Sequence, residues 1–242
     1  MKRMFVFVAS LLLAVNSWSQ DKNVNRMPML GSQAPSFTAE STTGKISFPG
    51  DFGNSWKILF SHPKDFTPVC SSELLELAYY QEEFEQLGTK LAVLSTDVLS
   101  QHLIWKTALE EIDYKDRGKV VINFPLISDD GYRASNLYGM IHPDVSIGQN
   151  IRGVFIINPD NRVMAINYYP NEVGRNIDEI KRTLIALQAT YNNRNIATPA
   201  NWQPGDDYMV PVLSDTERTQ LNSPGSFFYQ LSWFMTFKRN QD

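Results

Sequence analysis

The sequence predicts an α/β protein in layers, with a mixed sheet. Short apolar runs typical of buried strands alternate with segments whose apolar residues recur at helical spacing. The alternation ends in a strand–turn–strand pattern, which adds an antiparallel pair to the sheet, and a long amphipathic helix follows. A chain of 242 residues is long enough for one fairly large domain with an appendage.

The first half of the chain supplies two strands and two helices. Residues 57–60 form an apolar run typical of a buried strand. From Ser71 to Leu87 apolar residues recur at helical spacing, and Gly88 follows as a C-terminal stop. Residues 91–95 predict a second strand, and residues 99–111 a second helix.

The second half begins with the apolar segment 124–127, which leads into a turn sequence. Residues 153–157 and 162–168 flank an Asn-Pro-Asp-Asn turn and predict a hairpin. Asn176 is a predicted N-cap. The helix it opens has an apolar stripe formed by Ile177, Ile180, Leu184, Leu187 and Tyr191.

The composition excludes several classes of protein. With 43% hydrophobic and 20% charged residues, the chain is neither disordered nor collagen-like. Its net charge of −4 argues against a nucleic-acid partner, which requires a concentrated basic face. A single cysteine excludes an internal disulfide, an iron–sulfur cluster and a multi-cysteine zinc site. The three histidines are scattered at positions 62, 102 and 142, so no metal and no cofactor are expected.

The N-terminus predicts an exported protein. Lys2 and Arg3 precede an apolar run of about a dozen residues, shorter than the roughly 20 that span a bilayer. Small and polar residues follow, as in a secretory signal peptide. We therefore expect a signal peptide at 1–19, a linker at 20–27, a periplasmic or secreted mature protein and no membrane span after cleavage. The alternative is a buried N-terminal helix.

The densest chemistry lies around Cys70, between the first strand and the first helix. Thr67 is a suitable N-cap and Pro68 a favoured first helical residue. That register puts Cys70 in the first helical turn, where free N–H groups and the helix dipole favour a thiolate. The alternative is an inert, buried cysteine, and the local pattern alone leaves both open.

A cation beside the thiolate can come from elsewhere in the chain. Arg152 precedes an apolar strand, and Arg175 precedes the last long helix. A fixed guanidinium stabilises a thiolate and orients an oxygen-rich substrate. Taken alone, either arginine is equally well a surface residue. A cysteine hydrolase that pairs Cys70 with His62 or His142 is a further alternative.

Ordered motifs give these residues a context. Pro63, Thr67 and Cys70 satisfy P-x-x-x-T-x-x-C within the longer FSHPKDFTPVC of residues 60–70. The sequence closely resembles the peroxiredoxins (the alkyl hydroperoxide reductase C / thiol-specific antioxidant family), one-cysteine subfamily, over about residues 31–212. Six later segments of the chain also match motifs of this family: residues 124–127 (FPLI) with Asp129, Gly139–Pro143, Arg152 with the strand after it, Gly174–Asn176, Ala197–Trp202 and Gly205-Asp206.

The resemblance implies a thioredoxin-like three-layer fold with a mixed central sheet and a C-terminal peroxiredoxin extension. It also implies reduction of hydrogen peroxide and organic hydroperoxides. Cys70 matches the peroxidatic cysteine, which is oxidised to a sulfenic acid. Thr67 is expected to position the peroxide, Arg152 to hold the thiolate and the developing charge, and Pro63 to exclude water.

The same resemblance assigns supporting roles. Glu73 and Arg175 are expected to form an ion pair that fixes Arg152, and His62 matches a histidine of the subfamily. The chain has no second cysteine. An external thiol, either a thioredoxin-like protein or a small molecule, must therefore reduce the sulfenic acid.

The expected domains are a thioredoxin-like peroxiredoxin domain at 28–191 and an extension at 192–242 that serves as a dimerisation arm of a homodimer. Six aromatic residues of the extension suit either an interface or packing against the protein's own core: Phe227, Phe228, Tyr229, Trp233, Phe234 and Phe237. Two other classes of function remain open from the residues: the cysteine hydrolase and a non-catalytic thioredoxin-like binding module.

Overall fold

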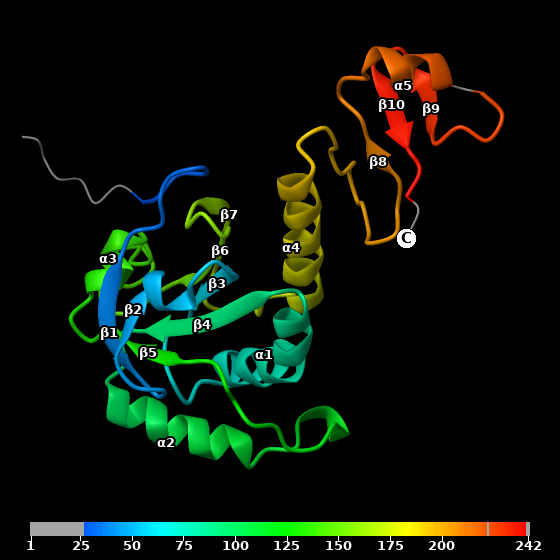
Figure 1. Cartoon of the computed structure of the whole chain (residues 1–242). Helices are drawn as coiled ribbons and strands as arrows, with labels where there is room; N and C mark the ends of the chain where they lie inside the picture. Colours follow the sequence, from blue (N-terminus) through cyan, green and yellow to red (C-terminus); the bar gives the residue numbers. More distant parts are fainter. Residues whose placement is uncertain (1–26, 222, 241–242) are drawn as a thin grey trace, which may run out of the picture.

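A computed structural model describes residues 27–221 and 223–240, and its centre is a seven-stranded sheet (Figure 1). The strand order is β2-β1-β5-β4-β3-β6-β7. The bounds are β1 Phe37–Ser41, β2 Ile46–Phe48, β3 Trp56–Ser61, β4 Thr89–Ser95, β5 Leu126–Ser128, β6 Arg152–Ile157 and β7 Val163–Tyr169. β3, β4 and β5 run parallel, whereas β1, β2, β6 and β7 pair antiparallel with their neighbours. The predicted mixed sheet and thioredoxin-like α/β fold are confirmed.

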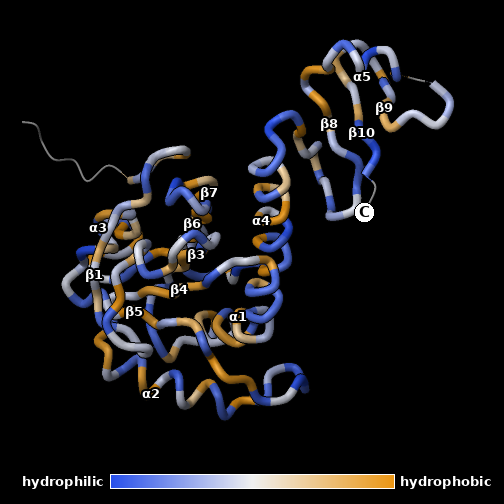
Figure 2. Tube along the Cα trace, in the orientation of Figure 1, coloured by the Kyte–Doolittle hydropathy of each residue, from blue (hydrophilic) through white to orange (hydrophobic). Residues whose placement is uncertain are grey.

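Helices cover both faces of the sheet. α1 (Pro68–Gln86), α2 (Leu99–Glu110) and α4 (Ile177–Asn192) pack on one face, and α3 (Arg133–Leu137) packs on the other. The alternation of side chains along β3 explains the division, because Ile58 and Phe60 enter the first core and Leu59 enters the second. Figure 2 shows apolar positions recurring between hydrophilic ones along α2 and α4, as expected for helices with one buried side.

Two short 3-10 segments complete the domain, at Gly50–Phe52 and Tyr114–Asp116. The predicted first helix begins three residues earlier than its apolar pattern indicates, at Pro68, because the apolar stripe starts only inside the first turn. Asn176 is the N-cap of α4, and its side chain accepts a hydrogen bond from the Glu179 N–H.

The C-terminal extension forms a second, smaller sheet of order β8-β10-β9. Its elements are β8 (Tyr208–Met209), α5 (Asp215–Gln220), β9 (Phe228–Ser232) and β10 (Met235–Lys238). It has a small apolar cluster of its own, formed by Val210, Leu213 and Phe228. Figure 1 shows it projecting from the body beyond the end of α4. The connection returns to α4, where Arg182 Nη1 donates to the Trp202 carbonyl at 3.0 Å.

In the described part of the chain, every helix is too short or too polar to span a bilayer. The predicted signal peptide and all but the last residue of the predicted linker lie outside the described residues.

Candidate active site

Cys70 is the third residue of α1 and has no solvent exposure. Thr67 is the N-cap, with extended backbone, and Pro68 is the first helical residue. The first intrahelical hydrogen bond runs from the Ser71 N–H to the Thr67 carbonyl, so the Cys70 N–H lies among the unpaired donors at the start of the helix. The Thr67 hydroxyl does not cap α1, because it donates to the Lys64 carbonyl at 2.9 Å.

Arg152, the first residue of β6, lies directly beside the sulfur. Its Nη1 donates to Cys70 Sγ at 3.3 Å and to Glu73 Oε2 at 2.7 Å. Its Nε and Nη2 donate to the Asn171 carbonyl at 3.0 and 2.6 Å. The guanidinium is thus held at three points, and its fixed positive charge stabilises a sulfur anion.

Glu73, one turn after Cys70, joins the two arginines. Its carboxylate accepts Arg152 Nη1, as well as Nε and Nη2 of Arg175 at 2.8 and 2.7 Å. Arg175 Nη1 donates to the carbonyls of Ser61 and Gly153 at 2.9 and 2.8 Å. Burial works to raise the pKa of Glu73, but the charges of Arg175 and Arg152 and their hydrogen bonds outweigh it. The pKa of Glu73 is therefore lower than its ordinary value of 4.5.

His62 and Pro63 follow β3 and are both buried. His62 Nε2 lies 2.8 Å from Asp65 Oδ1, and His102 Nδ1 from α2 lies 2.7 Å from Asp65 Oδ2. Burial is the largest influence on His62, and it lowers the pKa of the ring below 6.5 against the hydrogen bond and charge of Asp65. The sequence reasoning missed Asp65 and His102. Asp65 stands inside the FSHPKDFTPVC block, whereas His102 is 37 residues away and carries no local signal.

The turn before α1 is tightly built. Phe66 adopts a left-handed backbone conformation with φ of 57°, which is costly for an aromatic residue. Its ring lies 6.2 Å from that of Trp105, whose indole N–H donates to Ser71 Oγ at 3.3 Å. The turn and the first residues of α1 are therefore joined to α2.

One group of side chains near the site has the donor types of a metal site. Ligand atoms of His62, Asp65 and Asp97 lie within 4.8 Å of one another. These atoms already bond to protein groups: His62 Nε2 to Asp65, and Asp97 Oδ2 to the Asp65 N–H and the Ser95 hydroxyl. The cluster is held by hydrogen bonds between its own members.

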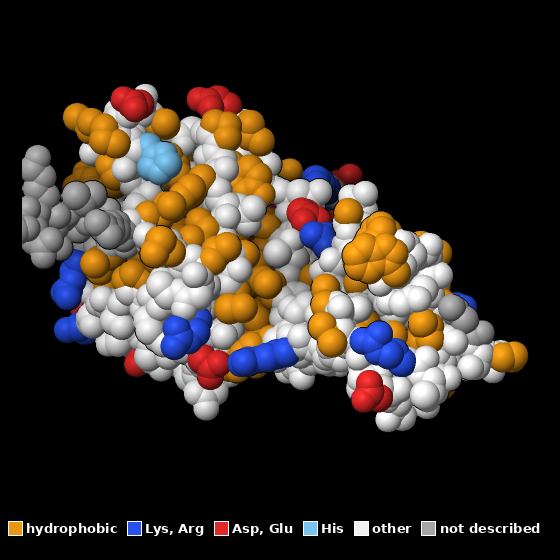
Figure 3. Space-filling view, turned by 90° about the horizontal axis from the view of Figure 1, so that it is seen from above, with side chains coloured by type: hydrophobic (Ala, Val, Ile, Leu, Met, Phe, Trp, Pro, Cys, Tyr) orange, Lys and Arg blue, Asp and Glu red, His pale blue; other side chains and the backbone are white. Residues whose placement is uncertain are grey.

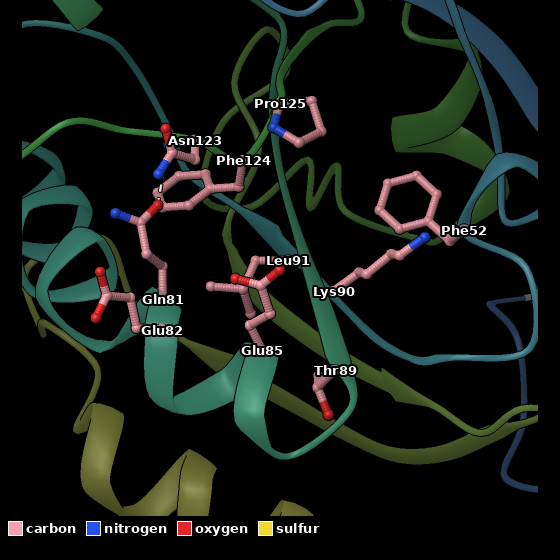
Figure 4. A pocket seen from close by; sticks show the side chains of 10 residues that line it. All are labelled: Phe52, Gln81, Glu82, Glu85, Thr89, Lys90, Leu91, Asn123, Phe124 and Pro125. Atoms are coloured by element: carbon pink, nitrogen blue, oxygen red, sulfur yellow. Dashed lines mark hydrogen bonds between the residues drawn. The ribbon is translucent and has the colours of Figure 1, made fainter.

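A cavity of about 290 Å³ lies elsewhere, against the second half of α1 (Figure 4). Its lining includes Gln81, Glu85, Lys90 and Phe124, and none of the predicted site residues. Gln81 Oε1 accepts the Asn123 N–H at 3.0 Å across this cavity. Because Cys70 stands at the opposite end of α1, this cavity is separate from the thiol site.

The geometry around Cys70 suits a nucleophilic thiolate held by a guanidinium. It does not show the sulfur–imidazole pair that a cysteine hydrolase uses, because the hydrogen bond to Sγ comes from Arg152. Of the two candidate histidines, His62 pairs with Asp65, and His142 Nε2 lies 3.2 Å from the Gly139 carbonyl.

Comparison with known proteins identifies the family. Residues 30–166 match the AhpC/TSA family, and residues 186–221 match the C-terminal domain of 1-Cys peroxiredoxin. A peroxiredoxin of Methanosarcina mazei is 44% identical over 217 residues, covering 88% of this chain and 99% of the relative. The chain belongs to the 1-Cys peroxiredoxins. A 1-Cys peroxiredoxin of Dictyostelium discoideum is 38% identical over 221 residues, covering 91% of this chain and 89% of the relative.

Solved peroxiredoxin structures agree. The yeast mitochondrial 1-Cys peroxiredoxin, solved in work on its thiol resolving mechanism via glutathione/thioredoxin systems, superposes with a TM-score of 0.77 at 34% identity, covering 88% of this chain and all of that one. The peroxiredoxin 6 of Arenicola marina superposes with a TM-score of 0.75 at 34% identity, covering 88% of this chain and 99% of that one. This peroxiredoxin is a thiol-dependent peroxidase, an oxidoreductase with a hydroperoxide substrate and a thiol reductant. These comparisons favour neither of the two alternatives, the cysteine hydrolase and the non-catalytic thioredoxin-like binding module.

Proposed function

We propose that Cys70 is the peroxidatic cysteine and that Arg152 is its main electrostatic partner. The observation that carries this assignment is the 3.3 Å hydrogen bond from Arg152 Nη1 to Cys70 Sγ, between two buried side chains. The thiolate attacks one peroxide oxygen, so that an S–O bond forms while the O–O bond breaks. Sulfur loses two electrons to the peroxide, and the leaving oxygen takes a proton to become water or an alcohol.

Arg152 and four further side chains serve this step. Arg152 stabilises the thiolate and the charge that builds on the breaking O–O unit, with no reorganisation at the moment of reaction. Thr67 positions the peroxide through its hydroxyl, which donates a hydrogen bond to the Lys64 carbonyl and whose oxygen can still accept one from the peroxide. Pro63 is buried beside the catalytic turn and excludes water. Glu73 and Arg175 hold Arg152 in place.

The sulfenic acid returns to the thiol through an external reductant. Cys70 is the only cysteine of the chain, so no resolving thiol comes from within. A first external thiol attacks the sulfenic sulfur, which gives a mixed disulfide and water. A second thiol attacks that disulfide, which frees Cys70 and leaves the external disulfide. A thioredoxin-like protein or a small thiol fits this role, and the yeast mitochondrial relative resolves its thiol via glutathione/thioredoxin systems.

The experiment is to treat the reduced protein with one equivalent of hydrogen peroxide and trap it with a sulfenic-acid-specific reagent. We expect one adduct, located by mass at Cys70 and absent from Cys70→Ser. A thiol that is accessible to alkylation yet gives no adduct under rapid mixing contradicts the assignment. Hydrolysis of an activated ester by the wild type and by Arg152→Ala supports the cysteine hydrolase instead.

We further propose that the extension is the arm of a homodimer. The aromatic residues of the extension differ in burial. Phe228 and Phe237 are buried, whereas Trp233 is 86% exposed and Phe234 is 65% exposed. Leu231 on β9 is also exposed, at 68%. Figure 3 shows hydrophobic side chains gathered on the upper face of the body and again on the extension. Exposed apolar surface of this kind is typical of an interaction site.

Light scattering after gel filtration measures the oligomeric state and so tests whether the extension holds a homodimer together. We expect a dimer for the wild type and a concentration-dependent shift to monomer for the double variant Trp233→Ser, Phe234→Ser. The matched control is Ile104→Ser, which removes an apolar side chain of α2 that is 64% exposed. A monomeric wild type contradicts the proposal.

We also propose that the protein is exported. It is supported by the basic residues Lys2 and Arg3, the apolar run after them and the small residues up to Ser19. N-terminal sequencing of protein recovered from its native compartment should give a mature chain that begins near Gln20. A chain that retains residues 1–19 in the cytoplasm contradicts this.

A further inference from the structure

The edge of β4 that faces β5 is only partly paired. β4 has seven residues, but its register with β5 starts at Val93. The Leu94 carbonyl accepts the His62 N–H from the β3 side, and the Val93 N–H bonds to the Pro125 carbonyl on the β5 side. Because this direction alternates along a strand, Leu91 faces the β5 side as Val93 does. Among the residues that the structure describes, none bonds to the Leu91 N–H or carbonyl.

Side chains hold the segment before β5 away from this edge. Gln81 of α1 accepts the Asn123 N–H with Oε1 at 3.0 Å, and its Nε2 donates to the Val121 carbonyl at 2.6 Å. Both bonds tie the segment to α1 instead of to β4. Position 125 is a proline, which has no N–H to give to the Leu91 carbonyl. The gap beside Leu91 is therefore built into the sequence of this segment.

The cavity of about 290 Å³ lies at this gap (Figure 4). Its lining joins Leu91 and residues 123–125 to α1 on one side and to Phe52 on the other. The volume is close to the lower end of the range for ligand sites. An open strand edge is the place where an extended peptide adds to a sheet, and a cavity of this size holds a short part of such a peptide.

The wall formed by α1 is acidic. Glu82 and Glu85 line the cavity, and neither carboxylate has an ion pair or hydrogen bond with any described residue. Glu83, between them in the sequence, differs because it pairs with Lys181 at 2.8 Å. Leu91 packs with α1 in the first core, so a residue paired with Leu91 points its side chain toward the same wall. A basic side chain there would meet two unpaired carboxylates.

The opposite face of the gap suits apolar side chains. Figure 4 shows Lys90 extending toward Phe52, away from Gln81 and Glu82. Phe52 belongs to the second core, and the charge of Lys90 disfavours another basic group there. Successive side chains of an extended segment point to opposite faces. The gap therefore fits a basic residue directed at α1 between two apolar residues directed at Phe52.

We propose that the gap beside Leu91 binds a short extended segment of another protein, in which one basic residue lies between two apolar ones. The backbone of the segment accepts the Leu91 N–H and donates to the Leu91 carbonyl, as a neighbouring strand does. Its basic side chain lies against Glu82 and Glu85. The site is at the other end of α1 from Cys70, so the proposal does not depend on the peroxidase chemistry.

The first test uses the capped tripeptide acetyl-Val-Arg-Val-amide and nitrogen-15 spectra of the reduced full-length protein. We expect the Leu91 amide signal to shift saturably and downfield, because the N–H gains a hydrogen bond. Two matched peptides test the recognition. Acetyl-Val-Glu-Val-amide reverses the charge, and acetyl-Val-Arg-Val-amide methylated on its backbone nitrogens loses its donors. Each should bind about three- to tenfold more weakly, the factor expected for one hydrogen bond or charged contact.

The second test changes the acidic wall. The double variant Glu82→Gln, Glu85→Gln should bind acetyl-Val-Arg-Val-amide about tenfold more weakly and keep the wild-type rate of peroxide reduction. The matched control is Glu83→Gln on the same helix, because that carboxylate pairs with Lys181 and does not line the cavity. We expect the control to bind the peptide as the wild type does.

Four results would overturn the proposal. In the free protein, hydrogen exchange at the Leu91 amide that is as slow as at Val93 would show a closed strand edge. A peptide that causes no saturable shift at Leu91, or equal binding of the three peptides, would show that the gap does not recognise the segment. Equal binding by the wild type and the double variant would exclude the acidic wall. A Leu91 signal that moves with protein concentration in the absence of peptide would assign the gap to a second copy of the chain.

Discussion

At the scale of single residues, the site is a balance of buried charges. Arg152, Arg175 and Glu73 carry a net charge of one positive unit, and all three are buried. Ionised Cys70 brings that sum to zero. Buried charges are tolerated when they are paired. A thiolate at Cys70 would be the fourth member of a neutral cluster, whereas a neutral thiol leaves one guanidinium charge unbalanced.

Arg152→Ala tests that balance. We expect the rate constant of Cys70 oxidation to fall about 10²- to 10³-fold, because a preorganised donor to the developing charge is lost. Lysine should recover little of the rate, since a point charge cannot reach sulfur, Glu73 and the Asn171 carbonyl together. Rapid mixing with peroxide measures the rate. Arg162→Ala, at an exposed arginine bonded to the Gly31 carbonyl, is the control. An unchanged rate in Arg152→Ala refutes the role.

Some of this site could be predicted from residues alone and some could not. The Thr67-Pro68 pair placed Cys70 in the first turn of a helix, since capping is a local property. The resemblance assigned the ion pair of Glu73 with Arg175. The direction of the Thr67 hydroxyl and the link from Asp65 to His102 depend on tertiary packing, and no local pattern encodes them.

At the scale of elements, the close approach of β3 and β6 holds the arginine beside the thiol. Gly153 follows Arg152 and faces Ser61 of β3. A Cβ atom added at Gly153 would lie 2.9 Å from Ser61 Oγ. That oxygen has no free room to move, because it donates to the Ile151 carbonyl and accepts the Gly153 N–H.

We therefore expect Gly153→Ala to cost about 1–3 kcal/mol of stability, as overpacking does, and to slow Cys70 oxidation by displacing Arg152. Urea unfolding and rapid mixing measure the two effects. Gly131→Ala is the matched control, because its Cβ would meet nothing within 4 Å and surface changes stay within about 0.5 kcal/mol. Equal stabilities of the two variants contradict the expected clash.

Elements with strong periodicity were predictable, and short ones were not. β3, β4 and β6 are continuous apolar runs, and α4 has an amphipathic stripe, so each is visible in the sequence. β1 is short and mostly polar, β2 has only three residues, and β8 has two. Such strands form because they pair with an existing sheet edge, which the segment itself does not specify.

At the scale of the whole molecule, the site exists only because the sheet is assembled. Cys70 and Arg152 are 82 residues apart, and Glu73 and Arg175 are 102 apart. Antiparallel pairing of β3 with β6 brings Arg152 beside the turn that leads from β3 into α1, whose first turn carries Cys70. Local sequence patterns do not predict the strand order. The sequence therefore indicated which residues form the site, but not how they come together in space.

The same long-range contacts make stability depend on pH in two stages. Folding lowers the pKa of His62 below 6.5, so the unfolded chain binds a proton first as pH falls. Stability therefore begins to decrease below about pH 6.5 as His62 is forced to remain neutral. Folding also lowers the pKa of Glu73 below its ordinary 4.5 and that of Asp65 below its ordinary 3.8, each against the opposing effect of burial. Their contribution is complete above those ordinary values and is lost as pH falls through the lowered ones.

Urea unfolding at a series of pH values from about 8 to about 3 measures both stages. We expect His62→Asn to flatten the upper stage and to weaken only the Asp65 part of the lower one, because His62 is one of the two histidines whose hydrogen bonds lower the pKa of Asp65. Glu73→Gln should flatten the lower stage and keep the upper one, because it leaves the histidine cluster intact and removes the carboxylate between the arginines. Its matched control is Glu76→Gln, whose partners Lys115 and Arg117 lie at the surface, so its effect should stay below about 1 kcal/mol. A single stage that both site variants alter equally would mean that the histidine cluster and the arginine cluster unfold as one titrating unit, and that the division drawn between them is wrong.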